Sequence, residues 1–205
     1  PALFEELAIP YTGSDAYVLT TTLDKWLTKV IVRERSSVDT PRARLVTARD
    51  LHGGERERSD GSLGVPLPAI VKPNYEGSSK GITDDSVARD VKALSTIVER
   101  ALRAYPAGLL IEEFIPGIEI AVPFIEGVAG DGVRTPVEYV IAEGHRSRYN
   151  LYDYRLKNHE SDAVDVRCPA DVPRDVLARI RSAAAATIRA LGIVDVGRID
   201  FRLGH

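Results

Sequence analysis

Residues 69–82 read AIVKPNYEGSSKGI, and the rest of the chain is best interpreted around this stretch. A short apolar run ends at Lys72, a turn begins at Pro73, and an apolar residue resumes after Gly81. This order is typical of a β-hairpin with a long tip. Small residues at the tip leave backbone N–H groups accessible, and the flanking lysines add positive charge, a combination that suits a triphosphate. We expect the tip to close over a nucleotide as a flap.

A second interpretation of the same residues is an ordinary glycine- and serine-rich hairpin tip with solvated lysines. Residues 69–82 alone do not separate the two interpretations, because short motif matches often arise by chance. The stretch is not a P-loop, since the pattern G-x-x-x-x-G-K-[ST] is absent and no helix is expected to begin there. The choice therefore depends on the rest of the chain.

Composition limits the classes of partner. The 205 residues are 44% hydrophobic and 28% charged, which is sufficient for a globular core. The formal net charge of −3 argues against a general nucleic-acid or anionic-membrane surface. We therefore expect small-molecule partners and local phosphate binding, with no nucleic acid and no membrane.

The cysteine and methionine counts bear on compartment and completeness. Cys168 is the single cysteine, so no internal disulfide can form, and a reducing, cytoplasmic setting fits best. The sequence contains no methionine. We therefore expect it to be part of a longer protein.

Apolar spacing predicts the helices. Residues 21–35 show helical periodicity, with Thr21 and Asp24 resembling a capping box. Lys25 and Lys29 lie one turn apart there, either as a solvated charged face or as phosphate ligands. Ser86 is expected to cap a second long helix. The other expected helical segments are residues 1–9 and 171–191.

Strands are predicted at residues 43–46, 109–115, 118–125, 137–142 and 194–203. Glu112 and Glu113 lie in one of them, where a strand edge beside a turn suits adenine, although paired carboxylates are also common surface charges. In the last strand Arg198 and Asp200 project from the same face. They suit phosphoryl stabilisation and Mg²⁺ binding, or equally a salt bridge with each other.

Two segments lack a clear period. Residues 150–165 are polar and aromatic, and we expect them to form a mobile lid, which is the name used below. Residues 51–65 are expected to be a mobile excursion before the hairpin.

The order of these pieces resembles the ATP-grasp superfamily, most closely the D-alanine–D-alanine ligases. The stretch 72–81 is similar to the family's K-P-x-x-x-G-S-S-x-G flap, and residues 110–119 to its E-E-F-I-x-G-x-E adenine segment. Residues 152–157 resemble its Y-D-Y-x-x-K lid, and residues 197–200 its G-R-x-D metal strand. Matches at residues 10–14, 24–25 and 168–170 extend the similarity over nearly the whole chain.

The resemblance implies an α+β (α/β) ATP-grasp fold, with two subdomains whose antiparallel sheets grip the nucleotide. Residues 1–19 would be the tail of an N-terminal substrate domain, residues 20–115 the central subdomain, and residues 116–205 the C-terminal subdomain. The implied activity is ATP- and Mg²⁺- (or Mn²⁺-) dependent formation of an amide through an acyl phosphate. The implied product is the D-alanine dipeptide of peptidoglycan precursors, made by a possible homodimer.

The resemblance also assigns residues. Lys25 and Lys72 would contact the α- and β-phosphates, Glu119 the ribose, and Asp200 the metal ion. The candidate catalytic residues are Arg198, Lys157 and Ser78. The remaining residues implied to bind the nucleotide are Glu76, Ser79, Glu112, Glu113, Phe114 and Ile115.

Three departures from the family pattern bear on these expectations. The second metal-binding run, E-x-N-x-x-P-G, does not occur, and nearly all of the N-terminal domain is missing. Arg155-Leu156 and Asn158 replace the usual Glu-Ala and the aromatic residue after the lid lysine, a position associated with the choice of second substrate. Two alternatives therefore remain, a ligase for other amino acids or natural-product intermediates, and a nucleotide-binding domain without turnover.

Overall fold

The computed structural model describes residues 1–52, 63–128 and 130–204. Its contacts divide the chain into two compact units. Unit 1 comprises residues 1–40, 117–140 and 165–205, and unit 2 comprises residues 41–116 and 141–164. Most of the predicted 51–65 excursion lies outside the described residues. Within the described ranges, no helix has the length and apolar character needed to cross a membrane.

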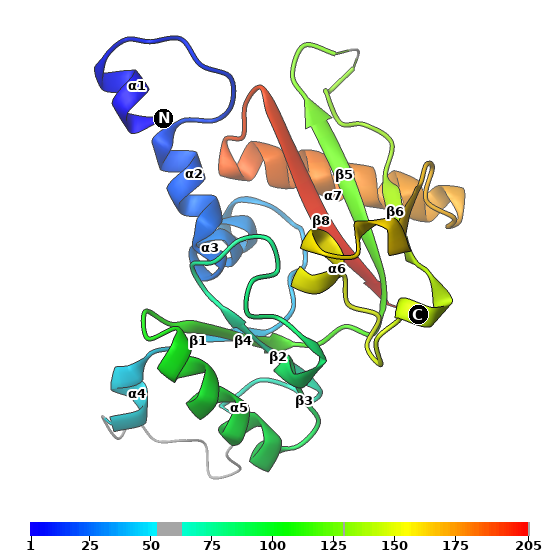
Figure 1. Cartoon of the computed structure of the whole chain (residues 1–205). Helices are drawn as coiled ribbons and strands as arrows, with labels where there is room; N and C mark the ends of the chain where they lie inside the picture. The colour runs from blue at the N-terminus through cyan, green and yellow to red at the C-terminus, as the bar shows by residue number, and fades with distance from the viewer. Residues whose placement is uncertain (53–62, 129, 205) are drawn as a thin grey trace. The chain divides into compact units, whose positions relative to one another are not determined.

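Unit 2 is built on an antiparallel sheet with strand order β1-β4-β2-β3. One helix, α5, packs against it through Leu94, Val98 and Leu102, which join a buried cluster with sheet residues such as Val71 and Ile111 (Figure 1). The elements of this sheet layer are β1 (Ala43–Val46), β2 (Ala69–Pro73), β3 (Val87–Ala88), α5 (Val91–Ala104) and β4 (Leu109–Glu113). A short helix, α4 (Ala48–His52), follows β1.

The predicted hairpin is confirmed, because β2 and β3 pair antiparallel around the flap. The sequence indicated that the return strand begins directly after Gly81. In the structure it begins at Val87. The reason is a single 3₁₀ turn, Asp84–Ser86, which Thr83 introduces by donating its N–H to Ser86 Oγ at 3.1 Å. The prediction that Ser86 caps the next helix is wrong for the same reason, and Asp90 caps α5 by accepting from Ala93 N at 2.8 Å.

Unit 1 contains the pair β5 (Gly117–Ile125) and β8 (Val196–Gly204) in a sheet of order β7-β6-β5-β8. Helix α7 (Arg174–Leu191) runs along one face of β5 and β8, where Ile180 and Ile188 join a buried cluster with Ile120 (Figure 1). Gly192 ends α7 in the left-handed conformation at φ 72°, as predicted for its C-terminus. The other two strands are β6 (Val137–Ile141) and β7 (Val164–Arg167).

The N-terminal helices of unit 1 differ from the prediction at one boundary. The sequence suggested a helix over residues 21–35, whereas α3 begins at Lys25 and Asp24 caps it by accepting from Leu27 N at 2.9 Å. Thr21 belongs to a separate helix, α2 (Ala16–Leu23), capped by Asp15. The remaining bounds are α1 (Ala2–Glu6) and α3 (Lys25–Arg35).

Candidate functional site

A lysine–glutamate pair joins two central strands of unit 2. Lys72 projects from β2 and its ammonium forms a salt bridge with Oε1 of Glu112 on β4. The Glu112 side chain is 9% exposed and that of Lys72 is 23% exposed. A carboxylate that is as little exposed to solvent as that of Glu112 needs a compensating charge. The salt bridge therefore fixes the Lys72 ammonium at this point of the sheet.

The flap, residues 74–81, has an unusual backbone at its tip. Ser78 and Ser79 adopt left-handed backbone conformations, at φ 52° and 57°, which residues other than glycine rarely adopt. The turn is closed by hydrogen bonds from Lys80 N to Gly77 O and from Ile82 N to Ser79 O, both at 3.0 Å. Such strained residues concentrate at ligand clamps, which favours a binding function for this tip.

The flap meets the lid within unit 2. Ser79 Oγ donates a hydrogen bond to the carbonyl oxygen of Tyr152 at 3.0 Å. Lys157 lies on the lid helix α6 (Tyr154–Asn158), with Nζ 4.9 Å from the centre of the Tyr152 ring. The lid contains a helix that the sequence analysis did not predict, and Asp153 caps this helix by accepting from Leu156 N at 3.0 Å.

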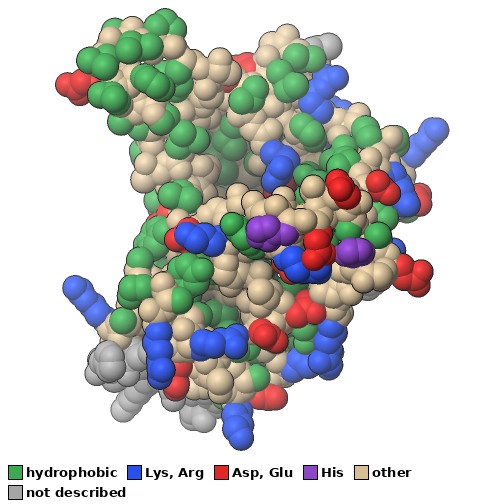
Figure 2. All heavy atoms as spheres, in the orientation of Figure 1, with side chains coloured by type: hydrophobic (Ala, Val, Ile, Leu, Met, Phe, Trp, Pro, Cys, Tyr) green, Lys and Arg blue, Asp and Glu red, His purple; other side chains and the backbone are tan. Residues whose placement is uncertain are grey.

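Two departures from the family pattern have structural roles in the lid. Leu156 is fully buried and packs with Ile141 and Ala163. Arg155 forms a salt bridge with Glu160, whose Oε2 is also 2.8 Å from Nδ1 of His145. Figure 2 shows acidic and basic side chains beside histidine side chains on one face of the molecule. Hydrogen bonds from His145 and then Arg155 lower the pKa of Glu160 below its usual range.

The Glu160→Gln substitution is expected to loosen the lid. It removes the negative charge that binds both Arg155 and His145, so amide hydrogen exchange across residues 154–160 should become several-fold faster at pH 7. Because the pKa of Glu160 is lowered in the folded protein, its ionised form stabilises the native lid at pH values above the pKa of the unfolded state. That contribution disappears as the pH falls through the folded value. Unchanged exchange in the variant would contradict this role.

The predicted adenine segment, residues 110–119, begins in β4 and continues beyond its end at Glu113. Glu113 N and Phe114 N donate within unit 2, to Arg42 O and Pro68 O, both at 2.8 Å. The Phe114 ring is buried and meets Tyr149 edge-on at 5.3 Å. Nucleotide contacts by this segment, including Ile115, remain a prediction.

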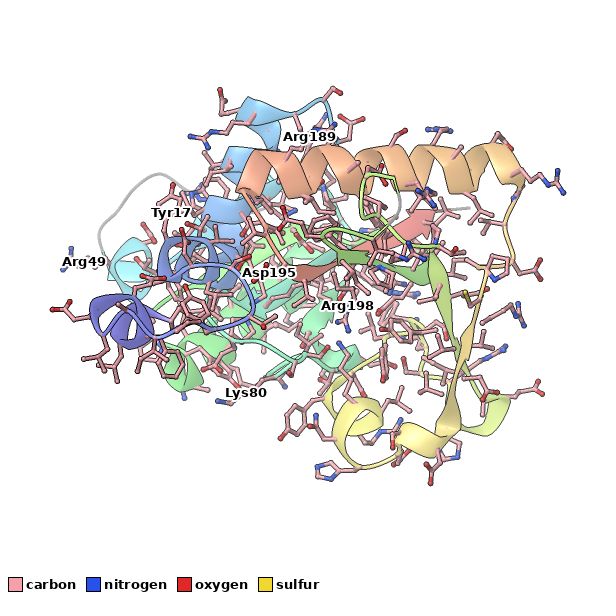
Figure 3. All side chains as sticks on the ribbon, turned by 90° about the horizontal axis from the view of Figure 1, so that it is seen from above. Tyr17, Arg49, Lys80, Arg189, Asp195 and Arg198 are labelled. Carbon is pink, nitrogen blue, oxygen red and sulfur yellow. The ribbon has the colours of Figure 1, made fainter. Side chains whose placement is uncertain are left out.

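Unit 1 carries the other predicted residues. Lys25 is the first residue of α3. Arg198, labelled in Figure 3, lies on β8 and binds Asp200 through two hydrogen bonds of 2.7 and 2.9 Å. Both side chains are about half exposed, at 49% and 54%. The structure therefore contains the predicted salt bridge between Arg198 and Asp200. It also confirms that both side chains project from the same face of β8.

Sequence reasoning overlooked Arg202. Its Nη1 donates to Oε1 of Glu119, the predicted ribose residue, at 2.8 Å. The signal was available, because Arg202 follows Asp200 by two residues and residues two apart share a strand face.

Each unit thus gathers part of the predicted site. Lys72, Glu112, Ser79 and Lys157 belong to unit 2, whereas Lys25, Glu119, Arg198 and Asp200 belong to unit 1. That both sets act on one nucleotide remains a prediction.

Comparison with known proteins identifies the family. Residues 47–205 match the family model described as D-ala D-ala ligase C-terminus. The chain belongs to the D-ala D-ala ligase C-terminus family. The D-alanine–D-alanine ligase A of Mesorhizobium japonicum is 35% identical over 95% of this chain and 51% of its own length. The chain therefore spans about half the length of this curated relative of the D-ala D-ala ligase C-terminus family.

Solved structures agree with the ATP-grasp fold of the D-ala D-ala ligases. The Bacillus anthracis D-alanine–D-alanine ligase complexed with ATP matches with a TM-score of 0.72 at 21% identity, over 98% of this chain and 58% of that one. The VanG D-Ala:D-Ser ligase of Enterococcus faecalis matches with a TM-score of 0.75 at 22% identity, over 99% and 55%. The predicted fold class and family resemblance are confirmed. The division at residues 19 and 115 stays a prediction.

Proposed function

We propose that this chain is the nucleotide-binding and catalytic part of an ATP-dependent carboxylate–amine ligase. The proposed reaction joins D-alanine to D-alanine, as in the synthesis of peptidoglycan precursors. Its support is the family match over residues 47–205, the names of relatives about 35% identical, and a structural neighbour that binds ATP.

The observation that carries the proposal is the contact between the flap and the lid. Ser79 donates to the Tyr152 carbonyl in the same unit that holds the Lys72–Glu112 pair and Lys157. An acyl phosphate hydrolyses readily in water, so a ligase needs mobile covers over its phosphates. Two covers that bond to each other beside fixed ammonium groups suit this need.

In the proposed reaction, a substrate carboxylate attacks the γ-phosphorus and ADP leaves. The amine of the second amino acid then attacks the acyl carbon, and inorganic phosphate leaves and takes up the proton that the nitrogen loses. Lys25 and Lys72 would bind the α- and β-phosphates, Lys157 the γ-phosphate, and Arg198 the charge that develops during transfer. The flap residues Glu76, Ser78 and Ser79 would cover the nucleotide, and Ser78 remains a candidate catalytic residue. The adenosine would contact Glu112, Glu113, Phe114, Ile115 and Glu119.

Asp200 is the residue that would hold Mg²⁺ or Mn²⁺. Carboxylate oxygens are the ligands that Mg²⁺ prefers, and one or two carboxylates with substrate phosphates commonly suffice. Among the described residues no group of three or more histidine, cysteine, aspartate or glutamate side chains could hold a metal ion. Phosphate oxygens of the nucleotide would be further ligands. The ion would neutralise phosphate charge during transfer. Asp200 fits this role once Arg198 turns from its carboxylate towards the phosphates.

A second candidate function is a ligase with another second amino acid. Asn158 stands where the family has an aromatic residue, and its Nδ2 donates to Tyr154 O at 2.9 Å, inside the lid helix. The D-Ala:D-Ser ligase among the structural neighbours is an example of such a change in substrate. A nucleotide-binding protein without turnover is the third possibility.

Phosphate release by the full-length protein separates these functions. We expect release from ATP and Mg²⁺ to rise at least about tenfold when D-alanine is added, because the carboxylate acceptor starts the reaction. D-serine, D-lactate and L-alanine serve as matched acceptors, and dipeptide formation is followed by mass spectrometry.

If phosphate is released only with another acceptor, that acceptor takes the place of D-alanine as the proposed substrate. ATP binding without release under any acceptor would leave a binding protein. The homodimer implied by the resemblance and the cytoplasmic setting inferred from the single cysteine remain part of this proposal.

A further inference from the structure

Three charged side chains line one face of β8, and a glutamate on β5 faces the last of them. Arg198, Asp200 and Arg202 alternate with Ile199 and Phe201, which join the apolar cluster under α7. On β5 the residue opposite Arg202 is Glu119. The charged row of unit 1 therefore ends in a cross-strand arginine–glutamate pair.

This pair is held more firmly than the neighbouring Arg198–Asp200 pair. Arg202 Nη1 donates to Glu119 Oε1 at 2.8 Å, while Nη2 donates to the Gly117 carbonyl at 2.9 Å. The side chains of Arg202 and Glu119 are 19% and 25% exposed. Desolvation lowers the pKa of Arg202, and Glu119 opposes that shift. The guanidinium is thus anchored to the backbone on one side and to the carboxylate on the other.

A carboxylate discriminates between sugars only when it is ionised and fixed in direction. Ribose hydroxyls donate to such an acceptor, and a ligand that lacks the hydroxyl forgoes that charge-assisted hydrogen bond. A glutamate side chain with free rotation would lose much of this advantage, because ordering it costs conformational entropy. An arginine that fixes the carboxylate in advance removes that cost.

We propose that Arg202 is a positioning residue that fixes Glu119 as the acceptor for the ribose hydroxyls, and so sets the preference for ribonucleotides over deoxyribonucleotides. This inference rests on the proposed function, since it needs Glu119 to contact the ribose of ATP. It assigns a role to a residue that the flap, lid and metal-strand motifs do not include.

Nucleotide titration tests the inference independently of turnover. Dissociation constants for ATP, 2′-deoxyATP and 3′-deoxyATP are measured with the full-length protein and its Arg202→Met and Arg202→Lys variants. We expect the wild-type protein to prefer ATP about tenfold or more over at least one deoxy nucleotide, from the usual strength of a charge-assisted hydrogen bond. Arg202→Met should reduce this ratio to about threefold or less, with its affinity for that deoxy nucleotide unchanged. Arg202→Lys should retain an intermediate ratio.

The matched control is Arg181→Met. It also removes one arginine and one ion pair from unit 1, the 3.5 Å contact with Asp131, and should keep the wild-type ratio. Retained affinity of Arg202→Met for the deoxy nucleotide shows that the variant is folded.

Three results would overturn the inference without overturning the proposed function. They are an unchanged ratio in Arg202→Met, an equal loss of affinity for all three nucleotides, and a wild-type protein without preference. Failure of the wild-type protein to bind any of them would instead overturn the proposed function, and the inference with it.

Discussion

Replacing Lys72 by alanine is expected to weaken ATP binding about 10- to 100-fold, the range of one or two charge-assisted hydrogen bonds. Lys72 is fixed at the end of β2 by Glu112, and we propose that it contacts the nucleotide phosphates. Its removal also leaves a nearly buried carboxylate without its cation. Titration with a non-hydrolysable ATP analogue measures the loss, and Lys72→Met, which keeps most of the aliphatic stem, separates charge from packing.

Lys80→Ala is the matched control, because it removes the same charge from the other side of the flap. Lys80, labelled in Figure 3, is exposed and pairs with Glu76 at 3.1 Å, and that hydrogen bond raises the pKa of Lys80. Exposed pairs of this kind contribute little, so the affinity should change less than about threefold. If the Lys72 and Lys80 variants lose the same affinity for the ATP analogue, the assignment of Lys72 to the phosphate site is wrong.

Replacing Gly117 by alanine is expected to destabilise the protein by about 3–5 kcal/mol, the combined cost of backbone strain and overpacking. Gly117 has φ 148°, and a Cβ atom there would lie 1.8 Å from the carbonyl oxygen of Leu203. The obstacle is backbone, so β5 and β8 would have to separate. Urea denaturation followed by circular dichroism measures the change in the free energy of unfolding.

Gly144→Ala is the control for this substitution, because no atom lies within 4 Å of its Cβ position and its φ is not positive. It should change the free energy of unfolding by less than about 0.5 kcal/mol. Similar midpoints for the two variants would show that β5 and β8 can part at Gly117 without penalty.

Local chemistry explains which elements the sequence predicted. Strand alternation placed Arg198 and Asp200 on one face, and Gly192 at the end of an apolar period marked the end of α7. The capping errors arose because several polar residues near each start can act as caps. Thr21 and Ser86 match the sequence pattern, yet hydrogen bonds in the structure make Asp24 and Asp90 the caps.

Other features depend on residues far apart in the chain. The contact between Ser79 and Tyr152 spans 73 positions, and no local period announces it. The lid helix was missed because its five residues are too few to show a period, and its stability comes from Asp153 and from the burial of Leu156. The salt bridge between Lys72 and Glu112 likewise follows from the pairing of β2 with β4.

The pairing of β5 with β8 also bears on how the chain acquires its structure during synthesis. Glu119 and Arg202 are 83 positions apart, and β8 is the last of the described strands to be synthesised. Until then β5 presents an unpaired edge, which is a hazard for intermolecular association. The described sheet of unit 2, β1-β4-β2-β3, has its last strand in the sequence end at Glu113, so this sheet can assemble before β8 has been synthesised.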